Sequence, residues 1–209
     1  MRRRFKLKAF IILVAVFALG ILLPLILHAS TVDNARTVKV SYTQKGFIEN
    51  LAPTAQKMSK NYGVLASILL SQAAYESNYG SSLLSVKYHN IYSLPARPGQ
   101  EHIYLKDNVY SKGKWQYQKV DFAVFRDWSS SMSSYLEELR QGRWGESTYK
   151  EVAGTTSYKV AAEKLQAAGF NSDPDYAKHL ISIIETYNLV FFNVSRSLDV
   201  FLALFQKEC

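Results

Sequence analysis

Glu76 is the side chain whose type and position point most directly to chemistry. It ends an apolar run over residues 64–74 and precedes turn-forming residues 77–80, which predicts a carboxyl group at the end of a buried helix. On that helix, Leu69, Gln72 and Glu76 would share one face. Desolvation by this face and the negative end of the helix dipole would both raise the pKa of Glu76. A carboxyl group that stays protonated near neutral pH can protonate a leaving oxygen, so we predict a general acid; the alternative is a solvent-facing glutamate at a frayed helix end.

The elements that must position this carboxyl group are mainly helices. Apolar residues recur at helical spacing over 47–58, and a break at residues 61–63 separates this helix from the one that carries Glu76. Side chains alternate over 103–110 and again over 115–125, with a polar turn between them. This pattern predicts a β-hairpin.

Three further helices are expected after the hairpin. Ser129 is placed to cap the first of them, and the second covers residues 160–165 and ends at Gly169. Asp173 and Pro174 have the residue types that begin the last helix. The sequence therefore predicts an α+β fold that is predominantly helical, with one small β-hairpin.

The N-terminus has the pattern of a membrane segment. Five basic residues occur in the tail 1–8, and no charged residue occurs from Ala9 to Leu27. We therefore expect a cytoplasmic tail, a single transmembrane helix over 9–28, a linker over 29–46 and an external domain over 47–190. A cleavable signal peptide, which would leave the domain secreted, is the alternative.

The charge and cysteine content narrow the range of partners and cofactors. The net charge is +8, but five of these positive charges belong to the N-terminal tail, so a nucleic-acid partner is not expected. The remaining excess is compatible with an anionic wall or membrane surface. Cys209 is the only cysteine and His89 has no partner at ligand spacing, so we expect neither an intramolecular disulfide nor a metal, and no other cofactor.

Five segments together carry a resemblance to a known family. They are FIENLAPTAQ, ILLSQAAYESNYGSSLL, HNIY, FAVFRDW and LQAAGFNSDPDYAKHLISIIETYNL, and they span residues 47–189. This stretch resembles the glucosaminidase domain of bacterial cell-wall hydrolases, the family of mannosyl-glycoprotein endo-beta-N-acetylglucosaminidase-like autolysins (glycoside hydrolase family 73). The resemblance implies a lysozyme-like α+β fold and cleavage of the β-1,4 bond after N-acetylglucosamine in peptidoglycan glycan strands.

The resemblance also implies roles for individual residues. Glu76 matches the family's catalytic general acid, Tyr176 a tyrosine in the cleft, and Asn90 the asparagine of a turn beside the cleft. Tyr92, which follows this asparagine, and Tyr110 in the hairpin are the aromatic rings that we expect to contact sugar. Without the resemblance, the position of Tyr176 on an amphipathic helix would favour a core tyrosine.

The chain departs from the family pattern at two places. The family usually continues from the asparagine turn with Phe-Gly, where this chain has Tyr92-Ser93. Many members also have a second glutamate just before the hairpin tyrosine, where this chain has Val109. Asp107, on the same face of the strand, is the nearest substitute. The alternatives are that Asp107 is a solvated turn residue, or that the substrate's own N-acetyl group acts as the nucleophile.

These observations predict a membrane-anchored peptidoglycan hydrolase with Glu76 as its general acid. The alternatives are a muramidase or a lytic transglycosylase on the same fold, or a protein that binds glycan or scaffolds wall synthesis without cutting. Residues 191–209 would form an amphipathic segment that either folds back onto the domain or contacts a membrane or cell-wall-synthesis protein.

Overall fold

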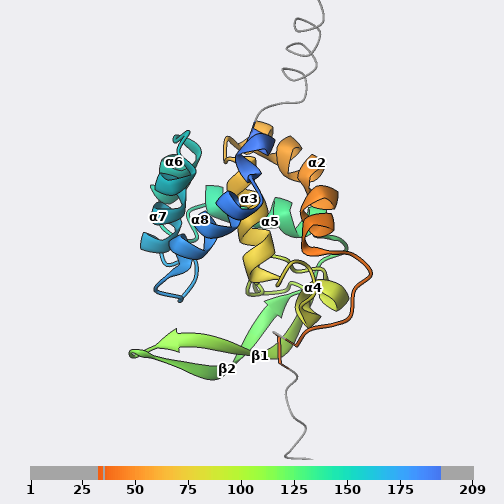
Figure 1. Cartoon of the computed structure of the whole chain (residues 1–209). Coiled ribbons are helices and arrows are strands. Elements are labelled where there is room, and N and C mark those ends of the chain that lie inside the picture. The colour runs from red at the N-terminus through yellow and green to blue at the C-terminus, as the bar shows by residue number, and fades with distance from the viewer. Residues whose placement is uncertain (1–32, 35, 194–209) are drawn as a thin grey trace, which may run out of the picture. The chain divides into compact units, whose positions relative to one another are not determined.

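The computed structural model describes residues 33, 34 and 36–193 (Figure 1). The expected tail 1–8, the membrane segment 9–28 and most of the segment 191–209 lie outside this part of the chain, so those predictions stay untested. Among the residues that are described, no helix has the length and apolar character needed to cross a membrane.

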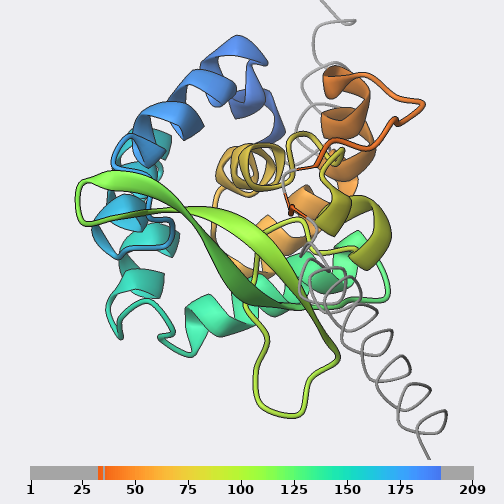
Figure 2. The same ribbon diagram turned by 90° about the horizontal axis from the view of Figure 1, so that it is seen from below.

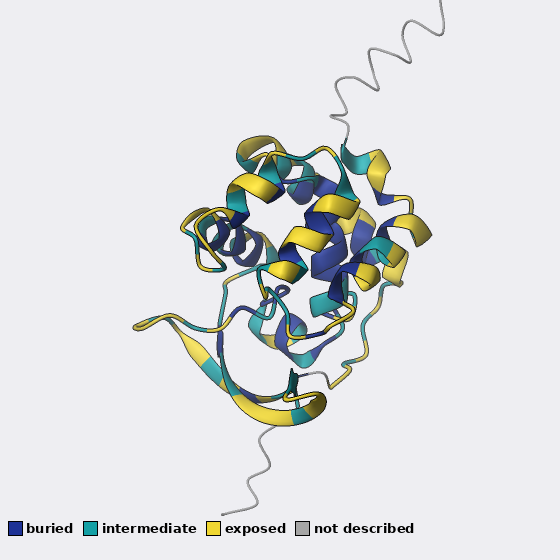
Figure 3. Ribbon diagram, turned by 90° about the vertical axis from the view of Figure 1, so that its left-hand side faces the viewer, coloured by how far each residue is buried: buried dark blue, intermediate teal, exposed yellow. Residues whose placement is uncertain are grey.

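A buried helix, α3 (Ala66–Glu76), lies at the centre of the helical part (Figures 1 and 3). Every residue from Ala66 to Ala74 is buried, because α3 packs against α2 (Gln44–Tyr62), α7 (Tyr158–Ala167), α8 (Tyr176–Thr186) and the 3-10 helix η1 (Leu189–Asn193). Burial on all sides explains the nearly continuous apolar sequence of α3.

Three more helices complete the described helical part. They are α4 (Leu83–Tyr88), α5 (Trp128–Arg140) and α6 (Thr148–Ala153). The sequence did not predict α4 or α6, because six residues are too few to show a helical period. The predicted α+β class, mainly helical with one hairpin, is confirmed by this architecture.

Two helices begin at other residues than the sequence predicted. Asp127, not Ser129, caps α5, since its carboxylate accepts the backbone N–H of Ser130 at 2.7 Å. Hydrogen bonds from Ser130 accordingly lower the pKa of Asp127 to about 2. Helix α8 begins at Tyr176, because Asp173 instead closes a turn before the helix by accepting the N–H of Asp175 at 2.9 Å.

The hairpin pairs β1 (His102–Ser111) with β2 (Lys114–Ala123) in antiparallel register. Lys112 and Gly113 in its two-residue turn both have positive φ, of 53° and 76°, as a type I′ turn requires. Viewed from below, the hairpin crosses the helical part (Figure 2). Leu105 and Phe122 anchor its base in a small second core.

The described residues from Asp33 to Asn193 belong to one compact unit, although residues 29–46 were expected to form a linker. Val38 N–H donates to the carbonyl of Ser81 at 2.8 Å, and the Tyr42 hydroxyl donates to the carbonyl of Gly80 at 2.8 Å. The described part of the expected linker therefore lies against the domain and leads directly into α2.

Candidate active site

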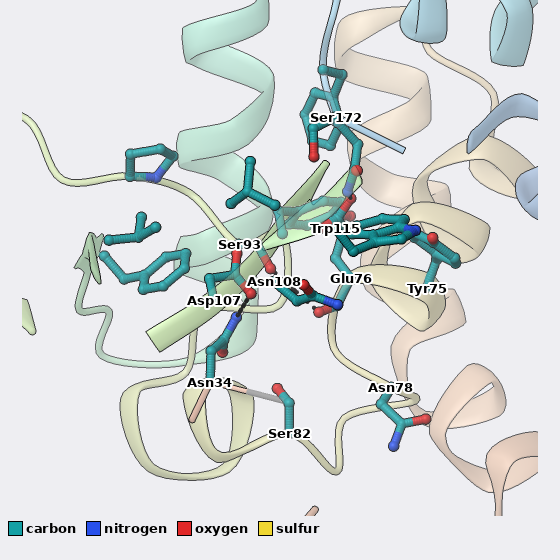
Figure 4. Close-up of a pocket in the computed structure, with 17 residues that line it drawn as sticks. Asn34, Tyr75, Glu76, Asn78, Ser82, Ser93, Asp107, Asn108, Trp115 and Ser172 are labelled. Atoms are coloured by element: carbon teal, nitrogen blue, oxygen red, sulfur yellow. Dashed lines mark hydrogen bonds between the residues drawn. The ribbon is translucent and has the colours of Figure 1, made fainter. Parts of the chain in front are cut away.

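A cavity of about 480 Å³ lies where the end of α3, the hairpin and the α7–α8 loop meet (Figure 4). Its lining combines two carboxyl groups with amides, hydroxyls and aromatic rings, which is the mixture that a sugar site needs. The lining residues are Asn34, Tyr75, Glu76, Asn78, Ser82, Tyr92, Ser93, Pro95, Asp107, Asn108, Val109, Trp115, Val120, Phe122, Phe170, Asn171 and Ser172.

Glu76 is the last residue of α3 and projects into this cavity. Burial is the main cause that raises its pKa, from 4.5 to about 7, and the charge of Asp107 acts in the same direction. Hydrogen bonds from Asn171, Ser93 and Tyr176 oppose the rise. The strongest of these comes from the Asn171 amide, which donates to Glu76 Oε1 at 2.8 Å. The carboxyl group therefore keeps its proton to a higher pH than a solvent-exposed glutamate does.

A chain of buried polar side chains from α3, α5 and α8 holds the Glu76 side chain in position. The Tyr135 hydroxyl donates to Gln72 Oε1 at 2.8 Å, and Gln72 Nε2 donates to the Tyr176 hydroxyl at 3.1 Å. This leaves the Tyr176 hydroxyl proton for Glu76, the carboxyl group whose pKa it lowers. All three supporting side chains are fully buried, so they fix the position of the acid.

The α7–α8 loop holds Asn171 in place beside Glu76. Asn171 Oδ1 accepts the backbone N–H of Asp173 at 2.9 Å. The buried carboxylate of Asp173 in turn accepts a hydrogen bond from the Tyr75 hydroxyl, and His179 Nε2 lies 3.4 Å from it. Neither Asn171 nor Asp173 was predicted as a site residue from the sequence, although both lie in the segment that contains Tyr176 and the predicted helix start.

Asp107 supplies the second carboxyl group of the cavity, from strand β1. Burial raises its pKa, while hydrogen bonds from the Asn34 amide and the backbone of Asn108 oppose the rise. Asn34 Nδ2 donates to Asp107 Oδ1 at 3.3 Å. Asn108 and Val109, the next two residues of β1, line the same cavity.

Asn90 and Tyr92 are both buried. Asn90 is buried and its amide donates to the carbonyls of Leu94 and Ala123 at 2.8 and 2.9 Å, so it shapes the loop. The Tyr92 ring stacks on Tyr135 at 4.5 Å and its hydroxyl donates into the core, although the residue also contributes to the cavity wall. Ser93 adopts a φ of 51°, in the left-handed region that favours glycine.

Tyr110 joins the hairpin to the α7–α8 loop rather than lining the cavity. Its backbone N–H donates to Ser172 Oγ at 3.0 Å, and its ring meets the ring of Trp115 edge-to-face at 5.4 Å. Trp115 lines the cavity and is 48% exposed, which makes it the accessible aromatic ring on this side. Substrate contacts by Asn90, Tyr92 and Tyr110 stay predictions, as do the catalytic roles of Glu76, Asp107 and Tyr176.

Comparison with known proteins identifies the family. The family model described as mannosyl-glycoprotein endo-beta-N-acetylglucosaminidase matches residues 52–189. The chain belongs to this glucosaminidase family. The predicted enzyme class, a glycoside hydrolase of the cell-wall glucosaminidase type, is confirmed by this match and by the first relative described below.

Individual relatives agree with the family assignment. The chain is 31% identical to the exo-glucosaminidase LytG of Bacillus subtilis over 89% of this chain and 68% of that protein. It is 29% identical to a probable N-acetylmuramidase of Lactococcus lactis over 73% of this chain, but spans only 36% of that protein. Among solved structures, the catalytic domain of the autolysin Auto from Listeria monocytogenes superposes with a TM-score of 0.63 at 28% identity, covering 76% of this chain and 92% of that one.

The part of the chain that the structure describes contains no group of three or more His, Cys, Asp or Glu side chains able to hold a metal ion.

Proposed function

We propose that this protein is a membrane-anchored peptidoglycan hydrolase that cleaves the β-1,4 bond after N-acetylglucosamine, with Glu76 as general acid. Family membership supports the coarser statement, a glycoside hydrolase acting on peptidoglycan. The single observation that carries the finer proposal is the Glu76 carboxyl group at the end of a buried helix, facing a cavity, with a pKa of about 7.

The cavity supports a proton transfer from Glu76 to the glycosidic oxygen. As the C–O bond breaks, the leaving sugar keeps the bonding electron pair and takes the proton, and Glu76 becomes a carboxylate. Asn171 and Tyr176 then stabilise this carboxylate through the hydrogen bonds that they already make. A water molecule supplies the hydroxyl group of the new reducing end, and the proton that it loses returns to Glu76 directly or by way of Asp107.

Asp107 is the candidate for the second role in glycoside hydrolysis. Its carboxyl group faces the same cavity and raises the pKa of Glu76, so the two groups are electrostatically coupled. As a carboxylate it would accept a proton from the attacking water or stabilise the positive charge that develops on the sugar ring. An N-acetyl group of the substrate is the alternative nucleophile.

Cleavage after N-acetylmuramic acid is the second candidate function. Its support is the similarity to the Lactococcus lactis proteins named probable N-acetylmuramidases. The two activities differ in which sugar carries the new reducing end, and a transglycosylase would instead leave an anhydro ring. The products therefore distinguish all three reactions.

The predicted anchor would confine this activity to the membrane surface. Only residues 29–32 separate the predicted membrane segment from Asp33, where the domain begins. So short a stretch spans under about 20 Å even when fully extended. The enzyme would then act on glycan strands close to the membrane. The basic N-terminal tail favours an orientation that places the domain at the outer face.

Product analysis with two variants tests the proposal. The full chain in detergent, as wild type, Glu76→Gln and Glu101→Gln, is incubated with purified peptidoglycan, and the released saccharides are identified by mass spectrometry. Glu101 is exposed and does not line the cavity, so its variant is the matched control. Reducing-end N-acetylglucosamine from the wild type and the control, lost with Glu76→Gln, is the expected result. Equal release by all three proteins would exclude Glu76 as the acid.

A further inference from the structure

The hairpin has a solvent-facing side made of tyrosine and lysine. Directly opposite residues of an antiparallel pair share a face, and side chains along each strand alternate between faces. The register therefore places Tyr104, Lys106, Tyr117 and Lys119 on one face, and all four are exposed. Tyr104 and Tyr117 are 46% and 65% exposed, and none of the four lines the cavity. These four residues are called the outer face of the hairpin, and Figure 3 shows how much of the hairpin is exposed.

The two lysines of the outer face stand directly opposite each other, Lys106 on β1 and Lys119 on β2. Like charges at such a cross-strand position repel, so the pair destabilises the hairpin unless an anion lies near both. The acid that the register places on the same side, Asp121, is paired with His102, whose Nδ1 lies 2.6 Å from Asp121 Oδ1. The lysine pair is therefore suited to an anionic partner.

Aromatic rings flank the lysine pair. Lys119 Nζ lies over the ring of Tyr104, 4.3 Å from its centroid, which holds the ammonium group at the surface. Tyr117 presents its ring to solvent, and Lys112 and Lys114 add positive charge at the turn. Tyrosine and lysine together are typical of surfaces at a membrane interface, where the ring enters the headgroup layer and the ammonium group meets lipid phosphate.

The chain also enters the domain at this hairpin. Asp33 forms a parallel bridge with Lys106, and Asn34 N–H donates to the carbonyl of Lys106 at 2.7 Å. Residues 29–32, which separate the predicted membrane segment from Asp33, span under about 20 Å. With the predicted anchor in a membrane, lipid headgroups would lie within reach of the outer face. This nearness favours lipid over an anionic polymer of the wall.

We propose that the outer face of the hairpin is a membrane-docking surface that binds anionic phospholipid headgroups, with its lysines against lipid phosphates and its tyrosines in the headgroup layer. The proposal rests on the membrane anchor of the proposed function. Asp107, which alternates with the outer-face residues along β1, lines the cavity. Docking through the outer face therefore leaves the Asp107 side of the hairpin free for glycan.

Hydroxyl-radical footprinting of the full chain tests this surface. The protein is reconstituted into nanodiscs of phosphatidylcholine alone, or of phosphatidylcholine mixed with phosphatidylglycerol, and mass spectrometry gives the oxidation rate of each side chain. Tyr117 reports on the outer face. Val160, which is 39% exposed on α7, is the reference side chain.

Two double variants separate the outer face from general positive charge. The test variant is Lys106→Gln/Lys119→Gln, and the matched control is Lys57→Gln/Lys60→Gln, which removes two exposed lysines from α2. Attraction to an anionic surface contributes about fivefold per lysine, so the test variant should lower the ratio of docked to undocked protein by about 25-fold. Thermal melting verifies that both variants are folded.

In the wild type, Tyr117 should be oxidised at least about fivefold more slowly with phosphatidylglycerol than without it, while Val160 reacts equally in both. The test variant should lose most of this protection, and the control variant should keep it. High salt should weaken the protection in the wild type. In detergent, kcat/KM for a soluble tetrasaccharide of alternating N-acetylglucosamine and N-acetylmuramic acid should be unchanged in the test variant, since neither Lys106 nor Lys119 lines the cavity.

Four outcomes would overturn the inference. They are equal oxidation of Tyr117 in both lipids, equal loss of protection in both variants, and protection that appears only when soluble glycan or teichoic acid is added, which would assign the face to that polymer. The fourth, failure of the full chain to enter nanodiscs, would also refute the anchor. The product analysis with wild type and Glu76→Gln decides separately whether the hydrolase function stands.

Discussion

The hydrogen bond from Asn171 to Glu76 should set the alkaline limit of activity. A general acid must be protonated to act, so kcat/KM should fall above the pKa of Glu76, which is about 7. Asn171 donates to the carboxylate at 2.8 Å and so stabilises the inactive, charged form. Asn171→Ala removes this donor. The pKa of Glu76 should rise, and activity should extend to higher pH.

The size of the shift follows from the strength of the bond. A hydrogen bond to a charged group contributes about 1.5–3 kcal/mol, and one pKa unit corresponds to about 1.4 kcal/mol, so complete loss would move the pKa by about 1–2 units. Glu76 lines an open cavity, where water can replace part of the lost bond. We therefore expect a shift of about one unit, to a limit near pH ~8.

The assay is the pH profile of kcat/KM for saccharide release between pH 5 and pH 10. Asn108→Ala is the matched control, because Asn108 lines the same cavity from β1 but is not among the groups that shift the pKa of Glu76. An alkaline limit that stays in place or moves to lower pH in Asn171→Ala would refute the assignment of Glu76 as the acid. A shift of the same size in Asn108→Ala would attribute the effect to general solvation of the cavity.

Three other substitutions, at Glu76, Gly80 and Ser172, should alter stability or affinity in defined directions. Glu76→Gln should stabilise the protein above pH 7, by up to about 3 kcal/mol in urea unfolding, because folding raises the pKa of Glu76 and stability is lost as pH rises from 4.5 to about 7. Gly80→Ala should destabilise by about 2 kcal/mol or more in calorimetry, since Gly80 has a φ of 73° and its Cβ would lie 2.6 Å from the Phe47 ring. Ser172→Ala should raise KM a few-fold in the saccharide-release assay with little loss of stability, because it removes the acceptor for Tyr110 N–H.

Each of these outcomes has a control in the same chain. Glu101→Gln should show no pH-dependent gain in stability, and a gain equal to that of Glu76→Gln would contradict the burial argument. Gly113 also has positive φ, of 76°, but an added Cβ meets nothing within 4 Å. Equal destabilisation by Gly113→Ala and Gly80→Ala would show that the Phe47 contact is unimportant. Unchanged KM in Ser172→Ala would mean that the hairpin does not need this link.

The sequence predicted the elements that depend on local patterns. The buried helix ending at Glu76 and the hairpin between residues 103 and 125 are both encoded by the period of their apolar side chains, which can be counted along the chain. The errors were local as well. Ser129 and Asp173 are both residues that cap helices, but a capping type does not say which of several neighbouring candidates is used.

The candidate site could be predicted only in part, because its partners are distant in sequence. Asn171 is 95 residues from Glu76, and Asn34 is 73 residues from Asp107. An asparagine in a polar segment looks the same whether it faces solvent or a carboxyl group. The sequence also does not show how deeply Tyr92 lies, whose ring stacks on that of Tyr135 while the residue contributes to the cavity wall.

The sequence by itself determined the buried helix, the acid at its end, the hairpin and the resemblance to the glucosaminidase family. These follow from residue types and spacings that act over a few turns or a single strand. Only the tertiary structure decided the environment of that acid: which amide holds Glu76, which carboxyl group faces it, and how far its pKa rises. The reason is physical, since desolvation and hydrogen bonding depend on distances between groups that come together only when the chain has folded.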